Sequence, residues 1–230
     1  MTKGPTAFAF KVSPLQEGGL FVAAVAIVLF DYVIGGRHIN RDHAPYDRKT
    51  INWFDRGAVR WHNRVLGPLS YGMEVAAIVT PAIVTIHDRG FSRELAEDMW
   101  VYLETFAMSS VLNISIKTVA HRPVPLLYTG LYPALDGKAS SHHSFYSGHT
   151  AQMTNALVAN AVMSRLRGKK RAWPWTLAVI GTLAVSLARV GAGRHFYSDV
   201  AAGALAGGIV GSLVPLLHPV RRLGGTQPER

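Results

Sequence analysis

Residues 173–217 read WPWTLAVIGTLAVSLARVGAGRHFYSDVAAGALAGGIVGSLVPLL, two apolar runs that enclose a short polar stretch. In that stretch His195 and Asp199 are one helical turn apart, so the carboxylate can lie beside the imidazole ring and fix its tautomer. Arg189 and Arg194 add guanidinium groups, which bind phosphate oxygens bidentately. The spacing alone fits two interpretations: a histidine nucleophile with a phosphate clamp, or a basic loop at a membrane surface.

Apolar runs of this kind recur along the 230 residues, of which 49% are hydrophobic and only 17% are charged. Such runs are long enough to cross a bilayer as helices. We therefore expect one all-α domain, a six-transmembrane-helix bundle with its core at roughly 65–217. A soluble all-α protein is the alternative, and a cleaved signal peptide is disfavoured for the first run because no small-residue cleavage site follows it. The expected helices cover residues 18–35, 65–86, 95–116, 148–166, 173–187 and 200–217.

Two glutamates within the apolar runs, and the basic segment after the first run, allow further predictions. Glu74 and Glu104 fall inside expected spans, where ionisable groups are costly, so we expect them to face the bundle interior and pair with polar groups there. Residues 36–64 form a basic connector with interleaved aromatic side chains such as Trp53 and Trp61. This mixture favours a short helix in the headgroup region, with a solvated loop as the alternative.

Composition narrows the possible partners. The chain has no cysteine, which rules out disulfides, thiolate metal sites and a cysteine nucleophile. The formal charge of +10 calls for an anionic partner. No basic helix or aromatic-studded sheet typical of nucleic-acid readers is present. An anionic lipid, as substrate or as membrane surface, therefore fits better than nucleic acid, while the oligomeric state stays open.

Six spans place both termini on one side of the membrane and the loops after spans one, three and five on the other. Lys and Arg divide equally between the two sides, so the positive-inside rule alone does not decide the orientation. The basic cluster at 165–171 favours cytoplasmic termini. We expect a multi-pass protein of the inner (plasma) membrane with its site on the periplasmic or extracytoplasmic face.

The same parity brings three polar segments together. The segment 117–125 contains Lys117 and Arg122, and Ser147-Gly148-His149 begins the fourth expected helix. Free backbone N–H groups and the dipole at a helix N-terminus hold anions. Together with the stretch after the fifth span, these segments form a cationic cradle with two histidines, the composition that a phosphoryl-transfer site needs.

These segments resemble the three signature motifs of the type 2 phosphatidic acid phosphatase (PAP2) family: K-x6-R-P, P-S-G-H and S-R-x5-H-x3-D. The third matches in spacing from Arg189 through His195 to Asp199, and the second matches as Ser147-Gly148-His149. Tyr146 stands where the family usually has proline, and Ala188 where it usually has serine.

The first motif departs further. Counting from Lys117, Val124 occupies the position of the family's arginine, with Pro125 in register and Arg122 two residues earlier. Either Arg122 makes the missing phosphate contact, or Arg194 compensates for it, or the site is weakened.

The resemblance implies a PAP2/haloperoxidase-like site at one membrane face and a role for each matched residue. His195 would attack phosphorus, activated by Asp199, and His149 would protonate the leaving group and then activate water. The resemblance implies no cofactor and no metal. Phosphate would be held by Lys117, Arg122, Ser147, Gly148, Arg189 and Arg194.

Other functions remain open. A zinc hydrolase using His142, His143 and His149 is disfavoured because its ligands would be crowded and the chain lacks an HExxH helix. A vanadium haloperoxidase is a fold-level analogy only. A lipid phosphotransferase would use the same phosphohistidine, and a non-catalytic lipid-binding protein would have a site decayed at Val124. For His121, His142, His143, Arg60 and the other basic residues of the connector, a core histidine or an interfacial cation is favoured over a functional role.

The substrate class follows from the site's expected position at the membrane face. The spans can receive acyl or prenyl chains, which implies a lipid phosphate monoester or diphosphate. Undecaprenyl diphosphate, phosphatidic acid, phosphatidylglycerol phosphate and lipid A phosphate all satisfy this description.

Overall fold

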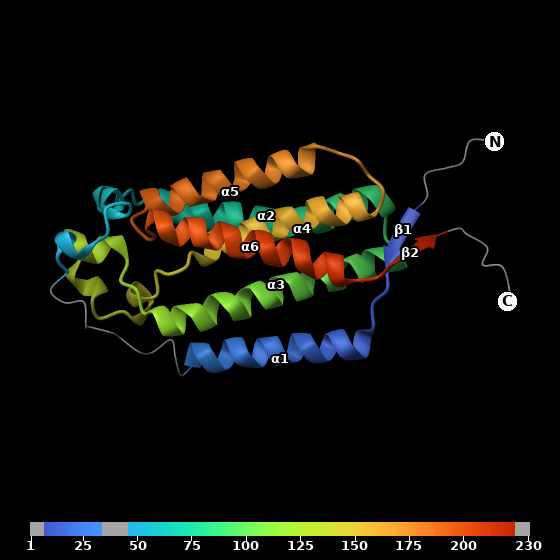
Figure 1. Ribbon diagram of the computed structural model, residues 1–230, viewed down its shortest axis with the longest axis horizontal. Coiled ribbons are helices and arrows are strands. Elements are labelled where there is room, and N and C mark those ends of the chain that lie inside the picture. Colours follow the sequence, from blue (N-terminus) through green and yellow to red (C-terminus); the bar gives the residue numbers. More distant parts are fainter. Residues whose placement is uncertain (1–6, 34–45, 224–230) are drawn as a thin grey trace.

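The computed structural model describes residues 7–33 and 46–223, and these residues form a bundle of six α-helices (Figure 1). Their order and approximate bounds are those expected from the apolar runs. Residues 34 and 35, at the expected end of the first helix, and residues 36–45 of the connector lie outside the described residues. The helices are α1 (Pro14–Val33), α2 (Leu66–Arg89), α3 (Arg93–Ala120), α4 (Gly148–Leu166), α5 (Trp173–Gly191) and α6 (Tyr197–Leu217).

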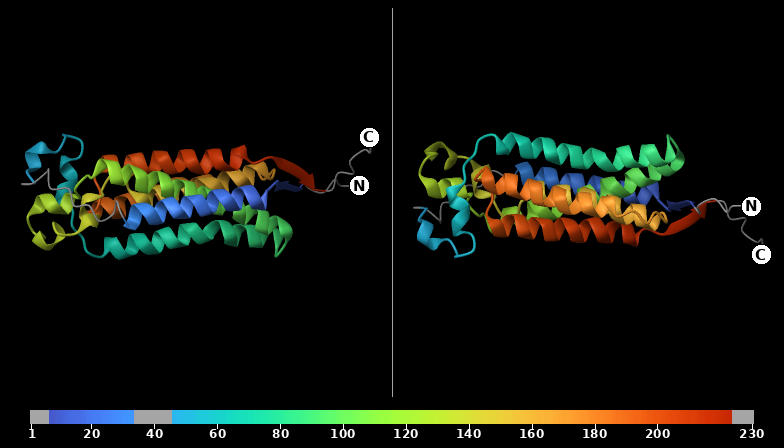
Figure 2. Two further views of the ribbon diagram at one scale, coloured as in Figure 1. Left: turned by 90° about the horizontal axis from the view of Figure 1, so that it is seen from below. Right: turned by 90° about the horizontal axis from the view of Figure 1, so that it is seen from above.

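Helix α4 is the centre of the bundle and packs against α2, α3, α5 and α6 (Figures 1 and 2). Its polar side chains have partners on α3: the Asn155 amide donates to the Thr105 carbonyl at 3.2 Å, and the Gln152 amide to the Ser110 hydroxyl at 2.7 Å. The outer helices instead expose large apolar side chains, such as Ile83 of α2 at 63% and Leu205 of α6 at 66%. A central helix shielded by its neighbours tolerates polar residues that lipid-facing helices do not.

Helices α4 and α6 approach each other closely because glycine lines their contact. A Cβ added at Gly207 would lie 2.2 Å from the Ala151 carbonyl oxygen, whereas one at Gly208 would meet only a methyl group at 4.0 Å. We expect Gly207→Ala to lower the free energy of unfolding in detergent by about 1–3 kcal/mol, the usual cost of overpacking. Gly208→Ala is the matched control, and equal stability of the two variants would contradict this packing.

Within residues 7–33 and 46–223, three helices are long and apolar enough to cross a membrane by length and composition: α2, α5 and α6. Among the described residues, α1 holds a shorter apolar segment, Gly18–Phe30. The glutamates inside the expected spans do find partners, as expected. Glu74 lies 3.3 Å from the His149 ring, and Glu104 lies 3.0 Å from the His218 ring.

Two short strands, one before α1 and one after α6, pair with each other. Strand β1 (Ala7–Phe10) pairs antiparallel with β2 (Val220–Leu223), with Phe10 opposite Val220. Phe10 is fully buried and packs against Val101 and Met163. The sequence analysis predicts no element at these residues; the alternating Ala-Phe-Ala-Phe pattern is the local strand signal there.

The connections 46–65, 121–147 and 192–196 gather at the end of the bundle opposite the paired strands (Figures 1 and 2). Helices α1, α3 and α5 end there, and α2, α4 and α6 begin there, as the parity of six helices requires. The loops expected on one face therefore do share one end of the molecule.

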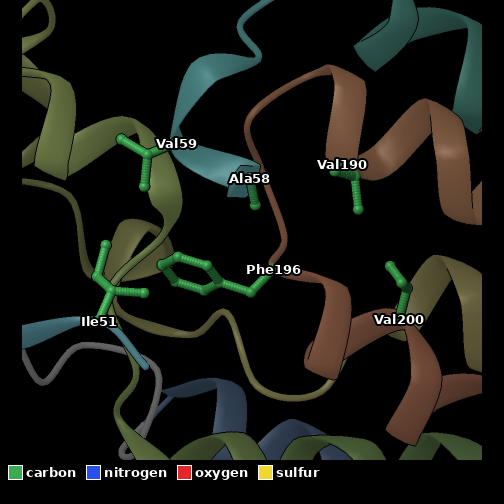
Figure 3. Close-up of a cluster of buried hydrophobic side chains, with 6 residues drawn as sticks. All are labelled: Ile51, Ala58, Val59, Val190, Phe196 and Val200. Carbon is green, nitrogen blue, oxygen red and sulfur yellow. The ribbon is translucent and has the colours of Figure 1, made fainter. Parts of the chain in front are cut away.

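The connector does not form the expected interfacial helix over its described residues. It contains two short 3-10 turns, Arg48–Thr50 and Arg56–Arg60, and it is fixed by packing. A buried apolar cluster joins it to the ends of α5 and α6 at the turn between them (Figure 3). The cluster comprises Ile51, Ala58, Val59, Val190, Phe196 and Val200.

Candidate active site

His195 lies in the turn between α5 and α6, and its ring is 4% exposed. Its Nδ1 atom is 2.8 Å from the Ser144 carbonyl oxygen. Because a carbonyl can only accept, Nδ1 carries the proton, and the lone pair of the neutral ring is on Nε2. Burial lowers the pKa of His195 to about 4, although the adjacent Asp199 carboxylate opposes this shift. The ring is therefore neutral near pH 7, with Nε2 available as a nucleophile.

This buried neutral ring predicts a pH dependence of stability. Between pH 6.5 and pH 4 the unfolded state binds a proton at His195 that the folded state does not, so stability falls as pH falls. We expect the unfolding free energy of the wild type to drop between pH 7 and pH 5 by about 2 kcal/mol more than that of His195→Gln. Unfolding in detergent at both pH values measures the difference. Parallel curves for the two proteins would contradict the buried neutral ring.

Asp199 is fully buried in the first turn of α6 and accepts three hydrogen bonds. They come from the Arg122 guanidinium (2.5 Å), the Ser144 hydroxyl (2.5 Å) and the Phe196 amide (2.8 Å). Its Oδ2 atom lies 3.7 Å from His195 Nδ1. The carboxylate is thus beside the imidazole, as expected, but the proton acceptor of the ring is the Ser144 carbonyl. Ser144 was missed because a backbone acceptor leaves no signal in the sequence.

Arg122 points into the protein and lies between two buried carboxylates. Its guanidinium is 2.5 Å from Asp199 and 2.7 Å from Asp55, and it stacks 4.1 Å from the centre of the Phe196 ring. The same group donates to the Ser198 hydroxyl at 2.7 Å. The two carboxylates neutralise the charge of the guanidinium. This geometry fits a residue that holds Asp199 in place.

Asp55 is the part of this network that the sequence analysis did not predict. It is fully buried and accepts from Arg122, from the Ser198 amide (2.8 Å) and hydroxyl (2.5 Å), and from Asn52 (2.9 Å). Burial alone would raise the pKa of its carboxyl, but these donors lower the pKa below its ordinary value. The connector therefore supplies a charged residue that ties the first and third motifs together.

Two further cations lie close to the His195 ring. Arg189, on the last turn of α5 and 7% exposed, has its guanidinium 3.4 Å from Nε2 of His195 and 3.1 Å from the Ser70 hydroxyl. Lys117, in the last turn of α3, donates to the His143 carbonyl at 3.0 Å. Arg189 is thus positioned beside the nitrogen that bears the lone pair.

The segment Ser147-Gly148-His149 forms the N-terminus of α4. Ser147 is the N-cap residue, and its amide donates to the Asp199 carbonyl at 3.0 Å, which joins the second and third motifs. Gly148 packs closely against α3: a Cβ there would lie 2.8 Å from the Asn113 side-chain oxygen, so Asn113 would have to shift. His149 lies against Glu74 at 3.3 Å and edge-on to the Tyr71 ring at 4.3 Å.

The other residues named in the sequence analysis lie in different environments. Arg194 is exposed, unlike Arg122 and Arg189. Val124 is buried in an apolar cluster with Leu126 and Leu127. The histidines of the zinc alternative face different partners: His142 lies against Asp136, and His149 against Glu74. Within 7–33 and 46–223, no three His, Asp or Glu side chains gather at one point.

The chain is similar to known proteins over the region that carries the three motifs. The family model of the PAP2 superfamily matches residues 98–223, which include all three segments. The structure is similar to that of a transmembrane PAP2-type phosphatidylglycerolphosphate phosphatase from Bacillus subtilis. The TM-score is 0.52 and the identity 19%, over 86% of this chain and 94% of that chain. No curated protein matches the sequence. At this identity the likeness shows a shared fold.

Proposed function

Because the chain belongs to the PAP2 superfamily, we propose that it is an integral-membrane lipid phosphatase that works through a phosphohistidine on His195. The observation that carries this proposal is the state of the His195 ring. Its Nδ1 proton is held by the Ser144 carbonyl, and its Nε2 lone pair faces the Arg189 guanidinium. A neutral imidazole beside a fixed cation suits attack on a phosphorus atom whose oxygens that cation binds.

In the first step the Nε2 lone pair of His195 forms a bond to phosphorus as the bond from phosphorus to the lipid oxygen breaks. His149 donates a proton to the departing oxygen, and its contact with Glu74 at 3.3 Å orients the ring. Arg189, Lys117 and the amides at the start of α4 stabilise the charge on the phosphoryl oxygens.

In the second step water attacks the phosphohistidine. His149 takes the proton from that water, the N–P bond breaks, and the electron pair returns to Nε2. Inorganic phosphate then leaves, and the Nδ1 contact with the Ser144 carbonyl has been kept throughout. Asp199 acts by holding the Ser144 hydroxyl and the turn that carries His195.

We propose that the site lies on the periplasmic or extracytoplasmic face of the inner membrane. The connections that carry the site share one end of the bundle, and the basic cluster at 165–171 lies at the other end. The positive-inside rule assigns such a cluster to the cytoplasm.

The direct test is phosphate release from a panel of lipid phosphates by the purified protein in detergent. We expect release of free phosphate from at least one of phosphatidic acid, phosphatidylglycerol phosphate, lipid A phosphate and undecaprenyl diphosphate. If substrate is consumed without release of free phosphate and labelled phosphate appears on a second lipid, the protein is a phosphotransferase. No turnover of any of these lipids would contradict the proposal.

A further inference from the structure

A basic pocket lies near the candidate active site. It has a volume of about 370 Å³ and is formed by the start of α2, the turn after α5 and the loop around Leu126 and Tyr132. This size is within the usual range for small-ligand pockets, about 300–1,000 Å³. Three of its lining side chains are basic: His62, Arg64 and Arg194.

The charge in this pocket is available to a ligand. None of the described residues that line it is acidic, and within the described residues neither Arg64 nor Arg194 forms an ion pair. Arg64 only approaches the Tyr132 ring, at 5.9 Å from the ring centre. This contrasts with Arg122, whose guanidinium is bound to two carboxylates. Exposed, unneutralised guanidinium groups that converge on a pocket bind phosphate or carboxylate.

The pocket adjoins the candidate active site through the backbone, since the Arg194 amide donates to the Arg189 carbonyl at 3.1 Å. Arg194 and Ala192 line it, and Arg194 directly precedes His195 in the chain. Gly67 lines it from the first turn of α2, and Ser70, about one turn further along that helix, binds Arg189 at 3.1 Å. An anion in the pocket would therefore lie next to a phosphoryl group held by Arg189.

The same helix, α2, also exposes an apolar face. Val65, Leu69 and Ile83 share this face of the helix and are 72%, 51% and 63% exposed. Apolar side chains exposed on a membrane helix contact acyl or prenyl chains. A substrate chain that lies against α2 would bring its headgroup past Arg64 before the terminal phosphate reaches His195.

We infer that this pocket binds a second phosphoryl group of the substrate, located between the scissile phosphate and the lipid chain. The inference rests on the proposed function and narrows its substrate class. Lipids with two phosphoryl groups, either a diphosphate or a phosphodiester with a terminal phosphate, meet both the catalytic cations and the pocket. A lipid with a single phosphate leaves Arg64 and Arg194 without a partner.

The test compares kcat/KM for three lipids in the same micelles: a prenyl diphosphate, phosphatidylglycerol phosphate and phosphatidic acid. We expect the wild type to prefer one or both of the two-phosphate lipids over phosphatidic acid. Arg64→Gln should lower that preference about tenfold, the effect of losing one charge-assisted contact. Arg60→Gln, an exposed connector cation outside the pocket, is the matched control and should keep the preference. The lipid whose kcat/KM advantage falls in Arg64→Gln shows whether the pocket binds the second phosphate of a diphosphate or that of a phosphodiester.

The outcomes separate this inference from the proposed function. Phosphate release from all three lipids without preference, or an equal loss on all three in Arg64→Gln, would overturn the inference and leave the phosphatase intact. A binding assay is independent of turnover: pyrophosphate should raise the melting temperature more than the same concentration of phosphate. That difference should vanish in Arg64→Gln, and its persistence would equally overturn the inference.

Discussion

Replacing His195 with glutamine is expected to lower phosphate release from the preferred lipid about a thousandfold or more, because the variant has no nucleophilic nitrogen. Glutamine is polar and of similar length, so the turn between α5 and α6 should keep its contacts with Asp199. The measurement is phosphate release in detergent at saturating substrate, with the melting temperature recorded for the same preparation.

The control for this variant is His87→Gln. His87 is an exposed histidine at the far end of α2, outside every contact of the candidate site. The His87→Gln variant should retain wild-type activity, which would exclude a general effect of removing a histidine. Activity of His195→Gln within tenfold of the wild type would refute the assignment of the nucleophile.

Arg122→Ala is expected to lower both stability and activity. Removing the guanidinium leaves the buried carboxylates of Asp55 and Asp199 without their shared cation. Losing one member of a buried ion pair costs about 3–5 kcal/mol in unfolding free energy. Displacement of Asp199 and the adjoining turn should in addition reduce kcat about a hundredfold, since small misplacements of catalytic groups have effects of this size.

Stability distinguishes a positioning role for Arg122 from phosphate binding. Arg194→Ala removes an exposed cation and should leave the melting temperature unchanged. Combining Arg122→Ala with Asp55→Asn removes one unpaired charge and should recover part of the lost stability. Arg122→Lys keeps the charge and gives a folded variant for kinetics. If Arg122→Ala loses activity but no stability, the arginine binds phosphate instead.

The helices could be predicted from the sequence because each apolar run is long and ends at polar or glycine-containing segments. The start of α4 at Gly148 is clear from the change at Ser147, which caps the helix. Strand β1 was missed because a four-residue strand stabilised by a partner more than two hundred residues away leaves only a weak local pattern.

The candidate site could be predicted in outline from motif spacing and helix parity. Those rules bring Lys117, His149 and His195 to one end of the bundle, where the structure also has them. They do not show where a side chain points. Arg122 was expected at the phosphate, but local sequence gives no sign of Asp55, 67 residues away, which holds it. The local sequence also does not show whether the Ser144 carbonyl or Asp199 accepts the hydrogen bond from Nδ1 of His195.

The central claim is that His195 carries the phosphoryl group during turnover. The most direct measurement is rapid quenching of the wild type with a lipid labelled with ³²P in its terminal phosphate, followed by protein gel analysis. We predict label on the protein that is stable to alkali, is released by acid, and is absent from His195→Gln. Phosphate release by the wild type with no labelled protein at any quench time, or label that persists in His195→Gln, would contradict the account.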